Sequence, residues 1–463
     1  MIRLFRVLIP ASVFALLLSE ILITACCFVL ACYLVLEIDP TVFLLYDGGA
    51  GRVAVAVLTV ILGLYFHDRY TVIRVRSRLA LLQDLLQVVG IGFLVQALLG
   101  YASRELMLPR RVMMYGSGGA VAALVVWRVV YSSLVLKIFG SQKILFVGAN
   151  DVVKEIAQHL EEHPDLGIQG LGYVDDPSPG SASFNPERAL GPLSDLKRVV
   201  AETKPDRIVV GMSERRARMP VLDLLDLRFA GILIEEAGEA YEAICGRVCT
   251  KELRPAQLIF TRELGPRPGN VLLQSAYSTL IALIGAVLAL PLAMAAALLV
   301  KLTSPGPVLF RQTRVGMDGA PFVLYKFRSM YADAEARSGA VWATRDDPRV
   351  TPVGKWLRRL RLDEIPQLWN VLRGEMSIVG PRPERPEFVK VLSEKIPFYR
   401  QRHAVKPGIT GWAQINHRYA DTIEDTITKL EFDLYYIKNI SPALDAYIIF
   451  HTIKTMLSSR GAQ

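Results

Sequence analysis

The stretch VLLQSAYSTLIALIGAVLALPLAMAAALLV, residues 271–300, carries no charged side chain and contains a single proline, Pro291. At about 1.5 Å per residue, a straight helix of this length could cross a bilayer. Proline in a helix interior removes a hydrogen bond and clashes with the preceding turn. We therefore expect a re-entrant helix over residues 271–302, broken at Pro291, that enters and leaves through one membrane face. A kinked full crossing is the less favoured alternative.

Four other apolar runs precede this stretch, at Leu8–Leu36, Val53–Phe66, Leu79–Gly100 and Val112–Leu136. Each approaches or exceeds the roughly 20 residues that a membrane span requires, although the second needs its flanks to reach that length. The sequence therefore predicts a four-helix transmembrane domain over residues 1–138. Glu20 lies inside the first run, where it could serve a proton path or, as we favour, a contact between helices.

Arginines in the loops indicate the orientation of this bundle. The loop after the first run is mainly acidic, whereas residues 67–78 contain Arg69, Arg74, Arg76 and Arg78. Cytoplasmic loops are enriched in Lys and Arg. We expect the N-terminus and everything after residue 136 on the cytoplasmic side of the membrane.

Composition and charge narrow the class of protein. Hydrophobic residues make up 52% and charged residues 21% of the 463 residues, which favours an anchored enzyme or receptor over a soluble domain or a pure bundle of spans. Residues 1–300 hold 28 basic and 27 acidic residues, whereas residues 301–463 hold 25 and 17. The C-terminal third is therefore expected to meet an anionic partner such as phosphate or a lipid surface.

Between the spans and residue 271, short apolar runs alternate with helical patterns. Runs ending at Gly148, Gly211 and Glu235 predict buried strands, and residues 152–162 predict a helix. This alternation is typical of a parallel sheet, so we expect a Rossmann-like α/β domain over residues 139–240 and a linker over 241–268. A dinucleotide fingerprint needs glycines two and five positions after Gly148, where this chain has Asn150 and Val153. The nucleotide site is thus degenerate, and a spacer or regulatory module is favoured.

The sequence GKWLRRLRLDEIPQLWN, residues 354–370, places Asp363 and Glu364 just after three arginines. Pro366 suits the first turn of a following helix, so both carboxylates would lie at a positive helix end and be ionised. Ionised carboxylates can bind Mg²⁺ or attack phosphorus. A surface ion network on an amphipathic helix is the alternative.

Other basic side chains favour the chemical interpretation. Arg382 lies in the rigid sequence Gly-Pro-Arg-Pro, and Lys326 and Arg328 alternate along a predicted strand, so that both face one side. Together with Arg358 they are candidate ligands for substrate phosphate. The sequence contains no Ser-His-Asp arrangement, P-loop or zinc-ligand spacing.

These motifs, in this order, resemble the bacterial polyprenyl-phosphate hexose-1-phosphate transferases, the large monotopic phosphoglycosyl transferases of exopolysaccharide and O-antigen initiation. The resemblance is strongest over about residues 273–458 and implies a catalytic domain over residues 269–463. It assigns catalysis and metal binding to Asp363 and Glu364, and phosphate contacts to Arg358 and Arg382. Many members have Ser before the proline of the re-entrant helix, where this chain has Leu290. The resemblance assigns nucleotide recognition to Pro407, Gly408, Thr410, Gly411 and Gln414.

The reaction that the resemblance implies has two steps and uses Mg²⁺. Asp363 attacks the β-phosphorus of a UDP-hexose and releases UMP, and undecaprenyl phosphate then takes the phosphosugar from the aspartate. Whether Glu364 serves the metal or a proton stays open, as does the choice among glucose, galactose and other hexoses. The implied partners are UDP-hexose, undecaprenyl phosphate, membrane lipids and a second copy of the chain, and no nucleic acid.

Two other functions are compatible with parts of the sequence. A membrane-anchored nucleotide-sugar dehydratase or epimerase would need an intact glycine fingerprint and a Tyr-x-x-x-Lys pair, but Tyr325 and Lys326 are adjacent. A non-catalytic scaffold for polysaccharide assembly would use the two carboxylates as a structural ion network.

Overall fold

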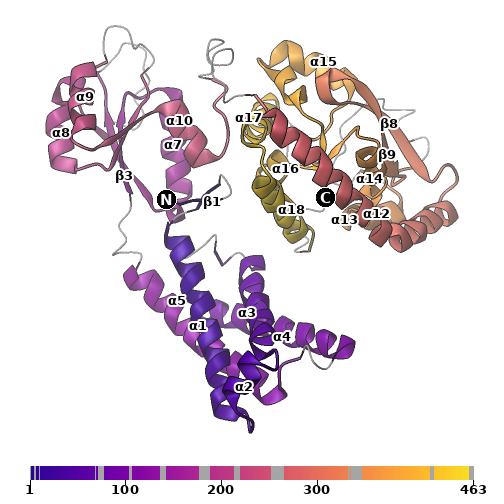
Figure 1. Ribbon diagram of the computed structural model, residues 1–463. Helices are drawn as coiled ribbons and strands as arrows, with labels where there is room; N and C mark the ends of the chain where they lie inside the picture. The colour runs from indigo at the N-terminus through magenta and orange to yellow at the C-terminus, as the bar shows by residue number, and fades with distance from the viewer. Residues whose placement is uncertain are drawn as a thin grey trace. The chain divides into compact units, whose positions relative to one another are not determined.

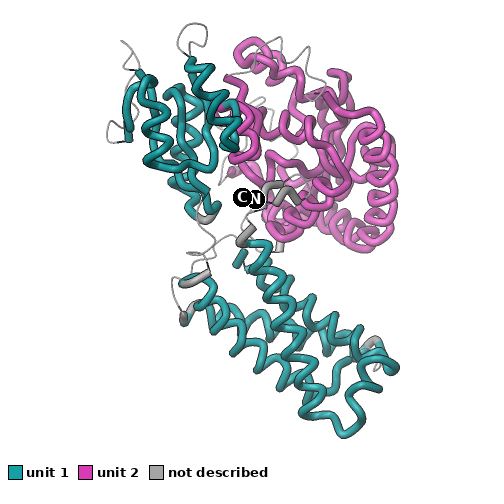
Figure 2. The backbone as a smooth tube through the Cα atoms, turned by 60° about the vertical axis from the view of Figure 1, so that its left-hand side comes forward, with its two compact units in different colours: residues 1–4, 8–236 teal, residues 5–7, 237–463 magenta. Residues whose placement is uncertain are grey.

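The computed structural model describes the chain except for residues 1, 5–6, 10, 68, 71–77, 104–106, 136–141, 177–187, 213–218, 252–264, 332–333, 335–346, 418–421 and 458–463. It divides into two compact units (Figure 2), the first running essentially to Glu236 and the second from Ala237 to the C-terminus. Arg74 and Arg76, on which the orientation partly rests, lie outside the described residues.

The first unit contains the predicted apolar helices. They are α1 (Ala11–Val35), α3 (Gly49–Phe66), α4 (Arg78–Ala102) and α5 (Arg110–Val130). This part of the chain also contains two short strands, β1 (Ile2–Leu4) and β2 (Val7–Ile9), a short helix α2 (Pro40–Leu45) and a short π-helix (Tyr131–Val135). With α12 of the second unit, five helices in the described part of the chain are long and apolar enough to cross a membrane. The number of actual crossings stays a prediction.

Glu20 makes a contact between helices. Its carboxylate, which is fully buried in α1, accepts hydrogen bonds from the Arg128 guanidinium of α5 at 2.6 and 3.0 Å and from the Tyr70 hydroxyl at 2.6 Å. A buried charge needs such a partner. This geometry matches the favoured helix–helix interpretation of Glu20.

A parallel sheet follows the helices (Figure 1), as predicted. Its order is β5-β4-β3-β6-β7, and every neighbouring pair is parallel. The strands are β3 (Gln142–Val147), β4 (Ile168–Val174), β5 (Ala189–Gly191), β6 (Arg207–Val210) and β7 (Leu233–Glu236), and the helices are α7 (Asp151–Glu162), α8 (Leu196–Thr203) and α9 (Val221–Phe229). Side chains of β3 and β6 pack with α8 and α9 in one apolar cluster. The strand order is that of the Rossmann fold.

The second unit combines helices with two small sheets. An antiparallel hairpin joins β8 (Leu309–Val315) to β9 (Pro321–Phe327), and a parallel pair joins β10 (Ser377–Val379) to β11 (Gly408–Thr410). Its helices are α10 (Ala237–Cys245), α12 (Pro268–Thr303), α13 (Pro352–Arg359), α14 (Gln367–Leu372), α15 (Pro386–Lys395), α16 (Trp412–Asn416), α17 (Ile423–Asn439) and α18 (Pro442–Leu457). One large apolar core connects β10 with α16, α17 and α18.

The boundary between the domains differs from the expected one. Residues 237–250 were assigned to the end of the α/β domain and the linker, but they pack on α17 of the second unit. The buried Glu431 carboxylate accepts hydrogen bonds from the Tyr241 hydroxyl and the Thr250 amide, both at 3.0 Å. Buried carboxylates need such donors, and this requirement cannot be seen in the local sequence.

Helix α12 is continuous through Pro291. The expected break of the helix at this proline is therefore not found, although Figure 1 shows that α12 bends along its length. Both of its halves contact the second unit. In the first half, Gln274 donates to Asp445 at 2.8 Å and Ser278 bonds Ser377 at 2.8 Å. In the second half, Ala296 and Val300 pack in an apolar cluster with residues of β9 and α13. Between these contacts, many leucines of α12 are exposed.

Candidate active site

The two adjacent carboxylates lie in a tight turn between two helices. Helix α13 ends at Arg359, a single 3₁₀ turn covers Leu362–Glu364, and α14 begins at Gln367 with Pro366 before its first residue. Arg361 has a φ of 53°, a left-handed conformation that is costly for a residue with a side chain. This backbone turn brings Asp363 and Glu364 into the interior, where both are buried.

Glu364 is bound by cations from three parts of the chain. Its Oε1 accepts hydrogen bonds from Lys326 Nζ and Arg382 Nη2, both at 3.0 Å, and Arg361 lies 3.8 Å from Oε2. Burial raises the pKa of Glu364, but the three cations outweigh burial and hold this pKa well below its usual range. Glu364 is therefore ionised, as predicted.

Asp363 has a different environment from its neighbour. Its carboxylate accepts no hydrogen bond from any residue that the structure describes, so its oxygens are not committed to a protein donor. Burial raises the pKa of Asp363, the Glu364 charge adds to this, and the cations Lys326, Arg358 and Arg382 only partly oppose it. The prediction that local charges would favour ionisation of both carboxylates is wrong for Asp363, because burial dominates there.

The candidate phosphate ligands do not form one cluster. Lys326 and Arg382 both contact Glu364, as described above. Arg328 follows the last residue of β9 and donates instead to the Ser304 carbonyl and hydroxyl, at 2.8 and 2.7 Å. Arg358 donates to Ser329 Oγ at 2.9 Å. Lys326 and Arg328 thus have different partners, and their role as phosphate ligands stays a prediction.

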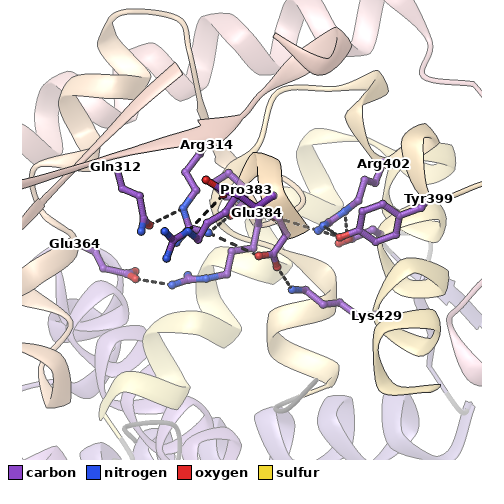
Figure 3. Close-up of polar contacts among 12 residues, drawn as sticks. Gln312, Arg314, Glu364, Pro383, Glu384, Tyr399, Arg402 and Lys429 are labelled. Atoms are coloured by element: carbon purple, nitrogen blue, oxygen red, sulfur yellow. Dashed lines mark hydrogen bonds and ion pairs between the residues drawn. The ribbon is translucent and has the colours of Figure 1, made fainter. Parts of the chain in front are cut away.

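Three basic residues hold the loop that carries Arg382 (Figure 3). Arg402 donates to the Arg382 carbonyl and Arg314 to the Pro383 carbonyl, each at 3.0 Å, and Lys429 pairs with Glu384 at 2.7 Å. Arg402 is itself fixed by the buried Asp433, at 2.7 Å. These contacts fix the backbone on both sides of Arg382, whose guanidinium donates to Glu364.

The segment expected to recognise nucleotide is largely buried. Gly408, Thr410 and Gly411 are buried, Pro407 lines a small hollow together with Arg382, and Gln414 donates to the Ile409 carbonyl. A Cβ on Gly408 or Gly411 would overlap the backbone of Gly380. These glycines allow β10 and β11 to approach each other closely, while a nucleotide contact of the segment stays a prediction.

A magnesium ion would find suitable donors at the two carboxylates. Mg²⁺ is usually held by one or two carboxylates with substrate phosphates completing its coordination. Glu364 Oε1 is occupied by two cations, which leaves Oε2 and the Asp363 oxygens as donors. Among the described residues there is no group of three His, Cys, Asp or Glu that could hold a metal without such help.

The α/β domain does not offer a phosphate site at its glycine turn. Gly148 has a φ of 86°, and a Cβ there would lie 2.5 Å from the Gly211 carbonyl oxygen. The start of α7 is satisfied from within the chain, because Asn150 accepts from the Val153 amide and Asp175 accepts from the Ala149 amide at 3.0 Å. A carboxylate at this position repels phosphate, and the domain therefore does not fit a dinucleotide or a coenzyme A phosphate there.

Sequence reasoning missed several residues that build the site. The anchoring pair Arg402 and Asp433 and the Gln274–Asp445 contact depend on partners distant in sequence, and the left-handed backbone of Arg361 has no residue-type signal because it is not a glycine. Gln274 was a usable signal, since it is a polar amide in an uncharged and mainly apolar run.

Comparison with known proteins gives the same picture as this geometry. A family model described as bacterial sugar transferase matches residues 269–459, and one described as a CoA-binding domain matches residues 62–226. The chain is 42% identical over 299 residues to the UDP-N-acetylgalactosamine-undecaprenyl-phosphate N-acetylgalactosaminephosphotransferase of Aeromonas hydrophila, covering 60% of this chain and 69% of the relative. It is 37% identical over 325 residues to the UDP-glucose:undecaprenyl-phosphate glucose-1-phosphate transferase of Escherichia coli (strain K12), covering 69% and 68%.

A carboxylate pair ringed by cations, beside a long apolar helix, defines a membrane-associated enzyme of phosphoryl transfer. More narrowly, the chain belongs to the bacterial sugar transferase family, the polyprenyl-phosphate hexose-1-phosphate transferases. This membership disfavours the dehydratase and scaffold alternatives.

Proposed function

We propose that this chain transfers a sugar 1-phosphate from a UDP-sugar to undecaprenyl phosphate, releasing UMP and starting the synthesis of an exopolysaccharide or O-antigen repeat unit. The observation that carries this proposal is the contrast within the carboxylate pair. Glu364 is bound to Lys326 and Arg382, whereas no described residue donates a hydrogen bond to the oxygens of Asp363, which lies within the same positive field. The relatives named above act on UDP-N-acetylgalactosamine or UDP-glucose, so the sugar is a hexose or an N-acetylhexosamine.

In the first step an Asp363 carboxylate oxygen forms a bond to the β-phosphorus of the UDP-sugar. The bond between this phosphorus and the bridging oxygen breaks, and UMP leaves with that oxygen and the electron pair. Lys326 and Arg382 lie beside the carboxylates and can neutralise charge that develops on the phosphate oxygens. Mg²⁺, held by Asp363 and Glu364 when bound, supplies further positive charge.

In the second step an oxygen of undecaprenyl phosphate attacks the phosphorus of the aspartyl phosphosugar. The bond to Asp363 breaks, its electron pair returns to the carboxylate, and the product is an undecaprenyl-diphosphate sugar. Glu364 keeps Lys326 and Arg382 in place through both steps. We also propose that Glu364 binds the metal ion or transfers a proton.

We propose further that α12 is a re-entrant helix and that the second unit lies on the cytoplasmic face of the inner membrane. A straight helix of the 36 residues of α12 would be about 54 Å long. Contacts of both its halves with one compact unit, and the exposed leucines between them, support a helix that dips into the membrane and returns. The family resemblance also suggests a homodimer.

The test uses purified enzyme in nanodiscs with a panel of UDP-sugars, Mg²⁺ and undecaprenyl phosphate, measured by UMP release and by the mass of the lipid product. Asp363→Asn keeps the shape of the side chain but removes the attacking carboxylate, so turnover should fall by several orders of magnitude. Arg382→Ala should cost less, on the order of 10²–10³-fold.

Without the lipid acceptor, one sugar phosphate should add to the peptide that contains Asp363. Near-normal turnover of Asp363→Asn, or an adduct on Glu364, would contradict the mechanism. Absence of UMP release with every UDP-sugar would contradict the function itself.

A further inference from the structure

Arg328 is a buried cation whose hydrogen-bonding capacity is only partly used. Its exposed fraction is 4%, and its Nη2 donates to Ser304. Its Nε and Nη1 have no hydrogen-bond partner in the described part of the chain. Among the residues that the structure describes, no carboxylate lies within ion-pair distance of Arg328.

Such an environment is costly unless a ligand completes it. A buried charge without a counter-charge is destabilising, and so is each buried donor without an acceptor. Asp347, an acidic group close to the neighbouring Arg358, is paired with Arg349 at 2.6 Å and is not available. No carboxylate among the described residues is therefore the partner of Arg328, and an arginine fork suits the oxygens of a phosphate that a substrate would bring.

The position of Arg328 indicates where this anion comes from. Ser304 is the residue at which α12 ends, so Arg328 is bound to the end of the apolar helix. Leu298 and Leu302, in the last two turns of that helix, are exposed. A phosphate that approaches Arg328 along this helix end is attached to a lipid.

Arg328 is also connected to the nucleophile. The next residue, Ser329, accepts a hydrogen bond from Arg358, and the Arg358 charge acts on Asp363. Lys326 and Arg382, which contact Glu364, also act on the charge of Asp363. Arg358 therefore connects the end of β9, where Arg328 lies, with the cations around Asp363.

We infer that Arg328 binds the phosphate monoester of the polyprenyl acceptor, whereas Lys326 and Arg382 serve the donor diphosphate. This inference rests on the proposed function, because it assigns the second substrate of the same reaction. It predicts that loss of Arg328 affects the second step and spares the first.

The experiment separates the two steps in full-length enzyme in nanodiscs. The variants are Arg328→Gln and Arg328→Lys, and the matched control is Arg311→Gln, which removes an exposed arginine from β8. UMP release without acceptor should keep its amplitude and rate within about threefold in all variants. The KM for undecaprenyl phosphate should rise at least about tenfold in Arg328→Gln, less in Arg328→Lys, and not in Arg311→Gln.

A binding measurement makes the test independent of turnover. Undecaprenyl phosphate should bind Asp363→Asn enzyme at least about tenfold more weakly when Arg328→Gln is added. Nanodiscs of zwitterionic and of anionic phospholipid distinguish the two sources of lipid phosphate. An effect of equal size in both supports the acceptor, whereas an effect confined to anionic nanodiscs assigns Arg328 to phospholipid head groups and overturns the inference.

Loss of the acceptor-independent UMP burst in Arg328→Gln would also overturn the inference. In that case Arg328 would serve the donor or merely clamp the end of α12. If wild-type enzyme gives no burst, the two-step mechanism proposed above fails instead, and the two failures are thereby distinguished.

Discussion

At the scale of single residues, the site depends on the unequal environments of two adjacent carboxylates. Three cations balance the charge of Glu364, whereas the oxygens of Asp363 accept no hydrogen bond from a described residue and burial raises its pKa. A nucleophile must be ionised but not engaged by strong donors; the contacts provide the second property, and the charges of Lys326, Arg358 and Arg382 favour the first against burial.

The raised pKa of Asp363 predicts the acid limb of the pH profile. Activity needs the ionised carboxylate, so kcat/KM should fall as pH decreases through a midpoint above the usual value for Asp, about 3.9. Lys326→Met removes a cation that favours the ionised form of Asp363. The midpoint of the acid limb should therefore lie at a higher pH in this variant than in wild type. Arg311→Gln should leave the midpoint unchanged. A shift of the Lys326→Met midpoint to lower pH would contradict the assignment.

The adjacency of Asp363 and Glu364 and their arginine neighbours could be predicted from the sequence because they are local. Which carboxylate would be engaged could not, since Lys326 and Arg382 reach Glu364 from 38 and 18 residues away. Burial, which reverses the expected shift for Asp363, is a property of the folded unit.

At the scale of elements, β10 and β11 are joined by glycines that leave no room for side chains. The Cβ of an alanine at Gly380 would lie 2.5 Å from the Lys406 carbonyl oxygen, and one at Gly408 would overlap the Gly380 amide. Gly380 directly precedes the loop that carries Arg382, so this strand pair positions a cation of the site.

Gly408→Ala should therefore destabilise the second unit by about 3 kcal/mol or more, because backbone must move to accept the methyl group. Thermal unfolding and UMP release would be measured together, and both should fall. Gly269→Ala, at a position with no atom within 4 Å of the added carbon, is the control and should be near neutral. If Gly408→Ala were as stable as wild type, the backbones at Gly408 and Gly380 would not be packed as closely as the structure shows.

Elements with strong local signals were predictable, including the helix near 152–162 and the strands that end near Gly148 and Gly211. The sequence did not reveal that α10 packs in the second unit, because Tyr241 of α10 bonds Glu431, which is 190 residues away. No local pattern reports such a contact.

At the scale of the whole molecule, the contacts of residues 237–250 decide where a catalytic fragment must begin. A fragment from Ala237 keeps the donors of Glu431, whereas one from Pro268 leaves this buried carboxylate without Tyr241 and Thr250. The shorter fragment should melt several degrees lower, and Glu431→Gln should recover part of the loss in it but not in the longer one.

Activity of these fragments in nanodiscs reports on the α/β domain. Because its glycine turn is closed by Asp175, the longer fragment should keep transferase activity. A well-folded but inactive fragment would show that the α/β domain contributes to the reaction.

The topology of α12 can be tested directly. Reporters fused after Ser304 and at the C-terminus should both lie in the cytoplasm if the helix is re-entrant. Labelling of a cysteine introduced at Lys301 by a membrane-impermeant reagent from the periplasmic side would exclude this arrangement.

If α12 is re-entrant as proposed, its bend also has a consequence for the lipid around it. A helix that enters and leaves through one face displaces acyl chains from a single leaflet, so it acts as a wedge and widens that leaflet relative to the other. Insertion should then be easier where the host leaflet is loosely packed or convex. The rate at which such an enzyme meets its lipid substrate would depend on lateral pressure as well as on concentration, and membrane shape would become a variable of sugar transfer.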